Sequence, residues 1–144
     1  MVGLVVRRTI RATPARLFDA WTQPSHLKSW WGPPGVECAD AQVDLRVGGR
    51  YRIANRFPDG TIVWISGEFE LIEPPHRIVY TWQRESQADA ERVTVRFEPL
   101  GDATEVIVLH ERISDGVVRD GHETGWAGCL DGLEDYLRGI ARVT

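Results

Sequence analysis

The chain has 144 residues and a formal net charge of −4, with 42% hydrophobic and 26% charged residues. These values are typical of a globular protein that buries a core without metals or disulfides, and they predict a single domain over residues 1–144. The acidic balance argues against a nucleic-acid partner, which would favour a basic surface.

The first elements expected along the chain are a strand and two short helices. Alternation predicts a strand over Leu4–Ala12, and Thr13-Pro14 has the residue types of a helix N-cap followed by proline at the first helical position. A second short helix starts at Pro24 and ends before a Gly-Pro-Pro-Gly loop. Because Trp30 and Trp31 are adjacent, we expect only one of them to face the core and the other to lie at a pocket mouth or contact surface.

The middle of the chain, from Val36 to Ile113, shows only strand and turn signals. Gly48-Gly49 has the composition of a two-residue hairpin turn. The short connections predict an antiparallel meander. The expected strands are Glu37–Val47, Arg50–Phe57, Thr61–Ile72, Arg77–Arg84, Val93–Glu98 and Thr104–Arg112, with Glu85–Glu91 as a polar hairpin tip.

A long helix is expected over Gly121–Ile140, because its large residues recur at helical spacing on one face. Asp120 and Glu123 fit a capping box at its start. Four glycines at positions 121, 125, 128 and 132 form a second stripe, although glycine costs about 1 kcal/mol against alanine inside a helix. Three interpretations stay open: close packing on a sheet, room for a ligand, or a contact between subunits.

Together these elements predict an α+β fold in which a curved antiparallel sheet wraps around the long C-terminal helix. A curved sheet and a straight helix do not touch along their whole length. The space between them is where we expect a cavity.

Several segments resemble a known family. They are Val43–Tyr51, Gly67–Trp82, Trp30-Trp31-Gly32-Pro33 and Gly125-Trp126 with the leucines that follow. They resemble the family named for the activator of the ATPase of the ninety-kilodalton heat-shock protein. The resemblance implies the helix-grip architecture of the START-like (SRPBCC) superfamily, with seven antiparallel strands gripping the C-terminal helix. Members of that superfamily bind lipids, hormones and polyketides or cyclise polyketides, and some members of the family stimulate a chaperone's ATPase.

No self-sufficient catalytic motif is present: the chain has no phosphate-binding loop, no G-x-S-x-G and no HExxH. The four histidines have no i, i+4 partner, so we expect no metal and no cofactor. His110 and His122 are the best polar candidates inside a pocket, as satisfied core groups or as ligand-binding or acid–base groups. The predicted cavity residues are Trp31, Tyr51, Phe69, Tyr80, Trp82, His110, His122, Gly125, Trp126, Cys129 and Leu133.

Cys38 and Cys129 are isolated thiols that fit a reducing compartment, with one disulfide as the alternative. No apolar run is long enough for a membrane span, and the first residues lack the apolar region of a signal peptide. We therefore expect a cytoplasmic protein.

These observations favour the binding of a hydrophobic small molecule, lipid or polyketide-like, in the cavity between sheet and helix. Two alternatives remain: a stress-associated activator of a chaperone ATPase, and a cyclase, dehydratase or hydrolase that uses the same cavity. The sequence leaves enzymatic activity open and on balance favours a non-catalytic role. The expected partners are the small molecule and, in the second alternative, a chaperone, with the chain as a monomer or homodimer.

Overall fold

The computed structural model describes residues 1–139, so the predicted helix end at Ile140 lies outside the described part. It contains seven strands and three helices in the order β1, α1, α2, β2–β7, α3. Their bounds are β1 Val2–Ile10, α1 Pro14–Thr22, α2 Pro24–Trp30, β2 Glu37–Val43, β3 Arg50–Arg56, β4 Ile62–Glu73, β5 Arg77–Arg84, β6 Glu91–Leu100, β7 Ala103–Ile113 and α3 Gly116–Leu137.

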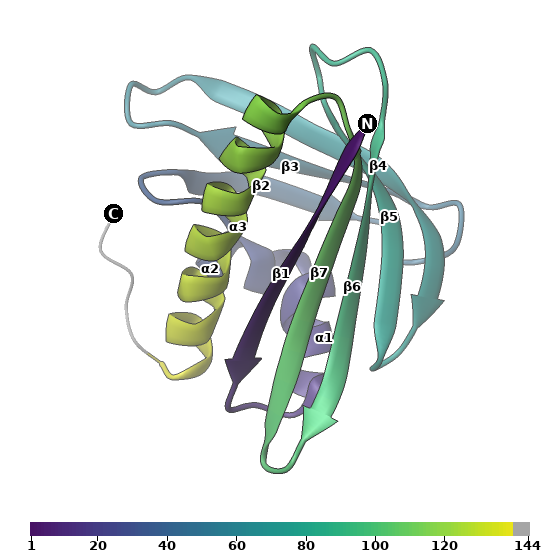
Figure 1. Cartoon of the computed structure of the whole chain (residues 1–144). Helices are drawn as coiled ribbons and strands as arrows, with labels where there is room; N and C mark the ends of the chain where they lie inside the picture. Colours follow the sequence, from purple (N-terminus) through teal and green to yellow (C-terminus); the bar gives the residue numbers. More distant parts are fainter. Residues whose placement is uncertain (140–144) are drawn as a thin grey trace.

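All seven strands form one antiparallel sheet in the order β1-β7-β6-β5-β4-β3-β2. Strands β2 to β6 each pair with the next strand along the chain, as the short connections predicted, and β1 completes the sheet by pairing with β7. Helix α3 lies across the sheet, with α1 and α2 beside its far end (Figure 1). The predicted α+β helix-grip fold is therefore confirmed.

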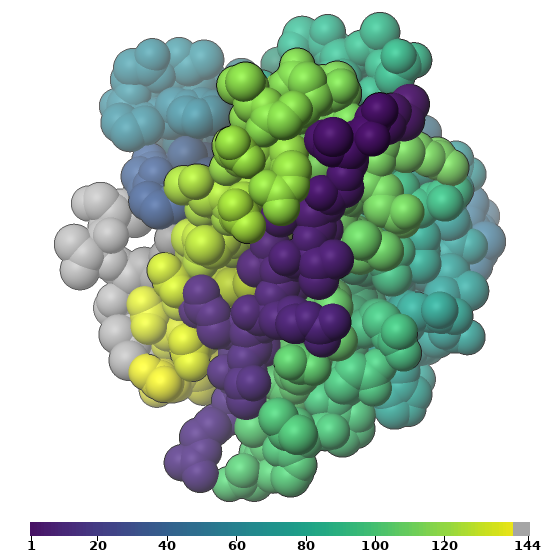
Figure 2. Space-filling model, in the orientation of Figure 1, coloured from purple at the N-terminus to yellow at the C-terminus, as the bar shows by residue number. Residues whose placement is uncertain are grey.

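Helix α3 is held to the first strand and first helix by polar contacts near its C-terminal end. Arg8 on β1 donates to Asp131 at 2.7 Å and to Glu134 at 3.4 Å. Arg16 on α1 donates to the backbone oxygen of Leu137 at 2.9 Å, satisfying a carbonyl that the helix end leaves open. The space-filling view shows β1 and α3 in contact along this face (Figure 2).

The start of α3 differs from the prediction. The helix begins at Gly116, and its N-cap is Asp115, whose side chain accepts from the backbone N–H of Val118 at 2.9 Å. The predicted start at Gly121 with a capping box at Asp120 was wrong by more than one turn. None of the helices within residues 1–139 combines the length and apolar character that a membrane crossing requires.

Two further predictions are corrected. Strand β2 ends at Val43 and β3 begins at Arg50, so six residues connect them in place of a two-residue turn at Gly48-Gly49. Trp30 and Trp31 are both buried, although they are adjacent. The reason is that α2 ends at Trp30 while Trp31 is extended, with φ −65° and ψ 140°, so the chain turns between the two rings.

Aromatic side chains fill the centre of the space between α3 and the sheet. Trp126 of α3 stacks on Trp21 of α1 at a ring-centroid distance of 5.9 Å and meets Trp31 edge-on at 5.6 Å. Tyr80 lies 5.1 Å from Tyr51 in an edge-to-face arrangement. These are favoured geometries for aromatic pairs, so this part of the interior is a packed core.

Candidate functional site

A pocket of about 340 Å³ lies between the sheet and the N-terminal half of α3. Its sheet wall comes from β3, β4, β5 and β7, and its helix wall comes from one face of α3. The lining residues are Trp31, Pro33, Asn55, Phe57, Val63, Ile65, Trp82, Arg84, His110, Gly121, His122, Gly125, Trp126 and Cys129. The wall is mainly aromatic and aliphatic, with a few polar groups.

The aromatic core leaves a second, much smaller space of about 20 Å³ deeper in the fold. It is lined by Tyr51, Phe69 and Tyr80 among others, and Trp31 and Trp82 line both spaces. That volume holds about one water molecule. A small molecule therefore has room in the larger pocket, beside residues 121–129 of α3, and none in the inner space.

The glycine stripe of α3 serves two different purposes along its length. A Cβ added at Gly121 or Gly125 meets nothing within 4 Å, and both positions line the larger pocket. A Cβ at Gly128 would lie 2.2 Å from Cδ of Pro34, so this glycine allows the helix to approach the loop between α2 and β2. Gly128 thus permits close packing, although on a loop and not on the sheet as predicted, whereas Gly121 and Gly125 leave open space at the pocket wall.

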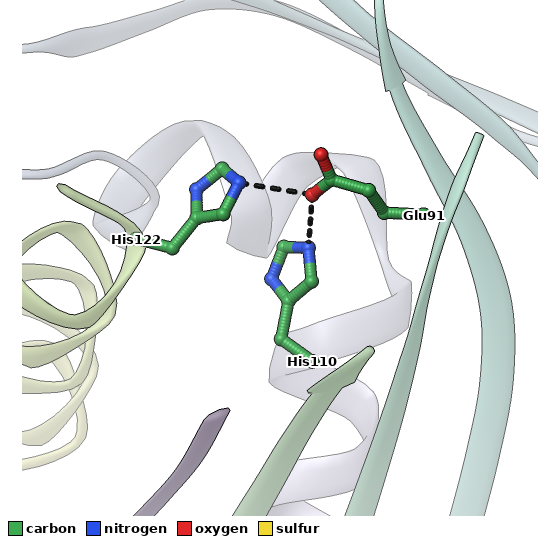
Figure 3. Close-up of side chains that lie close together, drawn as sticks. All are labelled: Glu91, His110 and His122. Atoms are coloured by element: carbon green, nitrogen blue, oxygen red, sulfur yellow. Dashed lines mark hydrogen bonds and ion pairs between the residues drawn. The ribbon is translucent and has the colours of Figure 1, made fainter. Parts of the chain in front are cut away.

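Three polar side chains meet at one end of the pocket: Glu91 from β6, His110 from β7 and His122 from α3 (Figure 3). Glu91 Oε1 accepts from His110 Nε2 at 2.6 Å and from His122 Nε2 at 2.9 Å. The exposed fractions of Glu91, His110 and His122 are 3%, 0% and 9%. The two imidazole rings stack with centroids 4.4 Å apart, and Trp82 meets both rings edge-on.

The hydrogen bond from Trp126 determines the protonation of His110. Trp126 Nε1 lies 3.0 Å from His110 Nδ1, and an indole nitrogen is only a donor. His110 Nδ1 must therefore carry a lone pair, so its ring proton is on Nε2 and is donated to Glu91. A flipped ring would place carbon atoms against both partners, which fixes the orientation as well.

The charge of the cluster follows from burial and hydrogen bonding. Burial alone would raise the pKa of Glu91, but the hydrogen bonds from His110 and His122 outweigh burial and lower that pKa to about 2. Burial also lowers the pKa of His110, in agreement with the donor that faces its Nδ1. Glu91 is thus an ionised carboxylate at neutral pH, and His110 is a neutral donor to it.

The cluster has the composition of a metal site, since two imidazoles and one carboxylate offer atoms within 4.8 Å of one another. Its hydrogen-bond polarity does not fit one. A histidine that binds a metal through Nε2 carries its proton on Nδ1 and donates it to an acceptor. Here Nδ1 of His110 faces the N–H of Trp126, so a metal on Nε2 would place two donors against each other.

The predicted cavity residues separate into groups. The larger pocket brings together seven of them: Trp31, Trp82, His110, His122, Gly125, Trp126 and Cys129. Three others line the small inner space and not the larger pocket: Tyr51, Phe69 and Tyr80. The last, Leu133, is fully buried in the core. Burial raises the pKa of Tyr51 and of Tyr80, so both phenols are protonated at neutral pH.

The sequence prediction missed polar residues of this region, among them Asn55 on the pocket wall and Glu91 behind the two histidines. Asn55 follows Tyr51 and Ile53 at strand alternation, which placed it on the inward face of β3. Glu91 was assigned to the polar hairpin tip, yet it begins β6 and shares the inward alternation of Val93 and Val95. The same alternation in each strand was the signal that could have found them.

The two cysteines are not joined by a disulfide in the described part of the chain. Cys129 is buried on the helix wall of the pocket. Cys38 is half-buried on β2, and burial raises the pKa of its thiol to about 11. A thiol with that pKa carries almost no thiolate at neutral pH, so Cys38 is a poor nucleophile.

The sequence model of one family, described as Activator of Hsp90 ATPase homolog 1-like protein, matches residues 11–138. Protein CV1439 from Chromobacterium violaceum is 25% identical, with a TM-score of 0.87 and coverage of 93% of this chain and 95% of that chain. The AHSA1 protein SPO3351 from Silicibacter pomeroyi is 24% identical, with a TM-score of 0.87 and coverage of 95% and 98%.

A similar structure from a eukaryote is PFC0360w from Plasmodium falciparum, which is described as an HSP90 activator. It is 27% identical, with a TM-score of 0.73 and coverage of 94% of this chain and 95% of that chain. The chain has no significant sequence match among the curated proteins.

Proposed function

The chain belongs to the family of Activator of Hsp90 ATPase homolog 1-like proteins, and within that fold we propose that it binds a hydrophobic small molecule in the pocket beside the first turns of α3. The observation that carries the proposal is the pocket of about 340 Å³ that opens where Gly121 and Gly125 have no side chains. This volume lies within the range of about 300–1,000 Å³ typical of small-molecule sites.

The chemistry of the wall supports an apolar ligand with at least one polar group. Trp31, Trp82 and Trp126 offer flat apolar surfaces, and Phe57 and Val63 extend them at the β3–β4 hairpin. A few polar groups on an otherwise apolar wall orient a ligand without a large desolvation cost. Asn55 and His122 are such groups here.

A thermal-shift screen against a panel of lipids, aromatic ketones and polyketide-like compounds tests the proposal. A ligand at one hundred times its dissociation constant adds about 2.7 kcal/mol of stability, which is several degrees in Tm for a chain of this size. Gly125→Leu fills the pocket and is expected to weaken binding at least about tenfold, because a buried leucine occupies the ligand's space.

Gly116→Leu is the matched control, because it adds the same side chain to α3 at a position with open space that does not line the pocket. Binding should survive in this variant. A panel that leaves the Tm of the wild-type chain unchanged, or a Gly125→Leu variant that binds as well as the control, refutes the proposal.

Stimulation of a chaperone ATPase is a second candidate. It is supported by the family and by the similarity to the Plasmodium falciparum protein described as an HSP90 activator. The test is the ATPase rate of a purified Hsp90-type chaperone with and without this chain. An unchanged rate together with no co-purification removes this candidate. Gel filtration in the same buffer decides between a monomer and a homodimer.

A further inference from the structure

We propose that His122 is an acid–base residue, and that the pocket catalyses proton transfer at a carbon next to a carbonyl group of an apolar ligand. This proposal rests on the binding function proposed above and adds a reaction to it. The geometry that carries it is the pairing of His122 on α3 with Glu91 on β6, together with the presence of Asn55 on the β3 wall of the pocket.

His122 is the histidine of the cluster that has a ring nitrogen available to a ligand. Its Nε2 is bonded to Glu91, and within residues 1–139 no hydrogen bond involves its Nδ1. No buried side-chain nitrogen or oxygen in the described residues lacks a partner. Nδ1 therefore has accessible surface, and His122 lines both the pocket and a hollow that it shares with Glu91 and Val118, whereas both nitrogens of His110 are occupied.

Glu91 prepares His122 for this role. The ionised carboxylate accepts the proton on Nε2 of His122, so in the neutral form of that ring the lone pair is on Nδ1, facing away from Glu91 (Figure 3). When Nδ1 takes a second proton, the imidazolium lies 2.9 Å from a carboxylate that stabilises the new charge. His110 and Gln87 hold that carboxylate in place by donating to its two oxygens.

Asn55 supplies a donor for the oxygen on which charge develops. Its Oδ1 accepts from Trp31 Nε1 at 3.0 Å, which leaves its NH₂ group as a donor. No other hydrogen bond of the Asn55 side chain occurs within residues 1–139, and no buried polar atom there lacks a partner, so this NH₂ group is accessible too. A neutral amide donor in a largely apolar pocket stabilises an enolate oxygen.

The reaction balances without a co-reactant. Nδ1 of His122 takes a proton from the carbon next to the carbonyl, and the electron pair of that C–H bond forms a C=C bond while the carbonyl π pair moves to oxygen. Asn55 donates to the resulting enolate. The imidazolium then returns a proton to the same carbon or, in an unsaturated ketone, to the γ-carbon, which shifts the double bond.

The experiment measures hydrogen–deuterium exchange of 2-tetralone in D₂O by NMR, and binding of the same ketone by thermal shift. The wild-type chain is expected to exceed an equal concentration of free imidazole at least about a hundredfold. His122→Gln should lose that excess while it still binds the ketone. Glu91→Gln should lower the rate at saturation with an unchanged half-saturation concentration, as a positioning residue does.

Two further variants complete the test. His76→Gln removes an exposed imidazole and should exchange at the wild-type rate. Asn55→Asp keeps the acceptor for Trp31 but replaces the donor with a negative charge, so its rate should fall to that of His122→Gln. Ketone binding with exchange at the imidazole rate overturns the reaction and leaves the binding function standing. Full activity in His122→Gln also overturns the reaction, and absence of ketone binding overturns the proposal for this ligand class.

Discussion

Replacement of Glu91 by glutamine tests whether an ionised carboxylate organises the interior polar cluster. Glu91 accepts hydrogen bonds from His110, His122 and Gln87 at 2.6, 2.9 and 2.9 Å. A glutamine has one oxygen and one NH₂ group, so at least one of these donors then faces another donor. The loss of a charge-assisted hydrogen bond in a buried site predicts a decrease of about 2–4 kcal/mol in the free energy of unfolding.

The stabilisation that Glu91 provides depends on pH, and the direction of that dependence follows from its pKa. The pKa of Glu91 falls from 4.5 to about 2 on folding, so the stabilisation is fully present above pH 4.5 and is lost as the pH falls toward 2. The difference between these two pKa values corresponds to about 3 kcal/mol. Urea unfolding between pH 7 and pH 3 should therefore show the wild-type chain approaching Glu91→Gln as the solution becomes acidic.

Glu111→Gln on the adjacent strand is the control, because its side chain is only half-buried. It should change stability by no more than about 0.5 kcal/mol, as surface substitutions do. If Glu91→Gln is as stable as this control at pH 7, or if its difference from the wild-type chain does not vary with pH, the ionised carboxylate is not the centre of the cluster and the argument fails.

Two other substitutions test the helix. Gly128→Ala is expected to lower the free energy of unfolding by about 1–2 kcal/mol, because the strain of placing a Cβ 2.2 Å from Pro34 Cδ exceeds the gain of about 1 kcal/mol in helix propensity. The control is Gly116→Ala, which has open space around it and should be neutral or stabilising. Equal thermal midpoints for the two variants would contradict the contact between Gly128 and Pro34. Asp115→Ala should lower the free energy of unfolding in urea by about 1 kcal/mol through loss of the N-cap, whereas Asp120→Ala should lower it by less than half of that. A larger effect at Asp120 than at Asp115 would favour the predicted capping box at Asp120.

The strands could be predicted from the sequence because their alternation is strong. Val93, Val95 and Phe97 on β6 are all fully buried, as their period of two requires. The first residue of α3 could not be predicted from a sequence pattern, because Asp115 and Asp120 are both suitable N-caps. The earlier start is supported by contacts distant in sequence, such as the hydrogen bond from Arg119 to the backbone oxygen of Gly3 at 3.0 Å.

The meeting of Glu91, His110 and His122 could not be predicted, although the alternation of β6 could have placed Glu91 on the inward face. Glu91 lies in a polar stretch that has the composition of a hairpin tip, and its partners are 19 and 31 residues away. No spacing rule connects positions so far apart. The sequence indicated the two histidines as inward-facing candidates, but only the pairing of β5 with β6 brings Glu91 opposite Trp82 and beneath the first turns of α3.

The pairing of β1 with β7 determines when the sheet can be completed during synthesis. Each strand from β2 to β7 finds a neighbour within the residues just made, but Val2 pairs with Ile113. The first strand must therefore wait until nearly the whole chain has left the ribosome, with Leu4 and Ile10 unburied in the meantime. Closure then brings together contacts of large sequence separation, which predicts slow folding for a chain of this size. A chaperone that shields the first ten residues would act on this step.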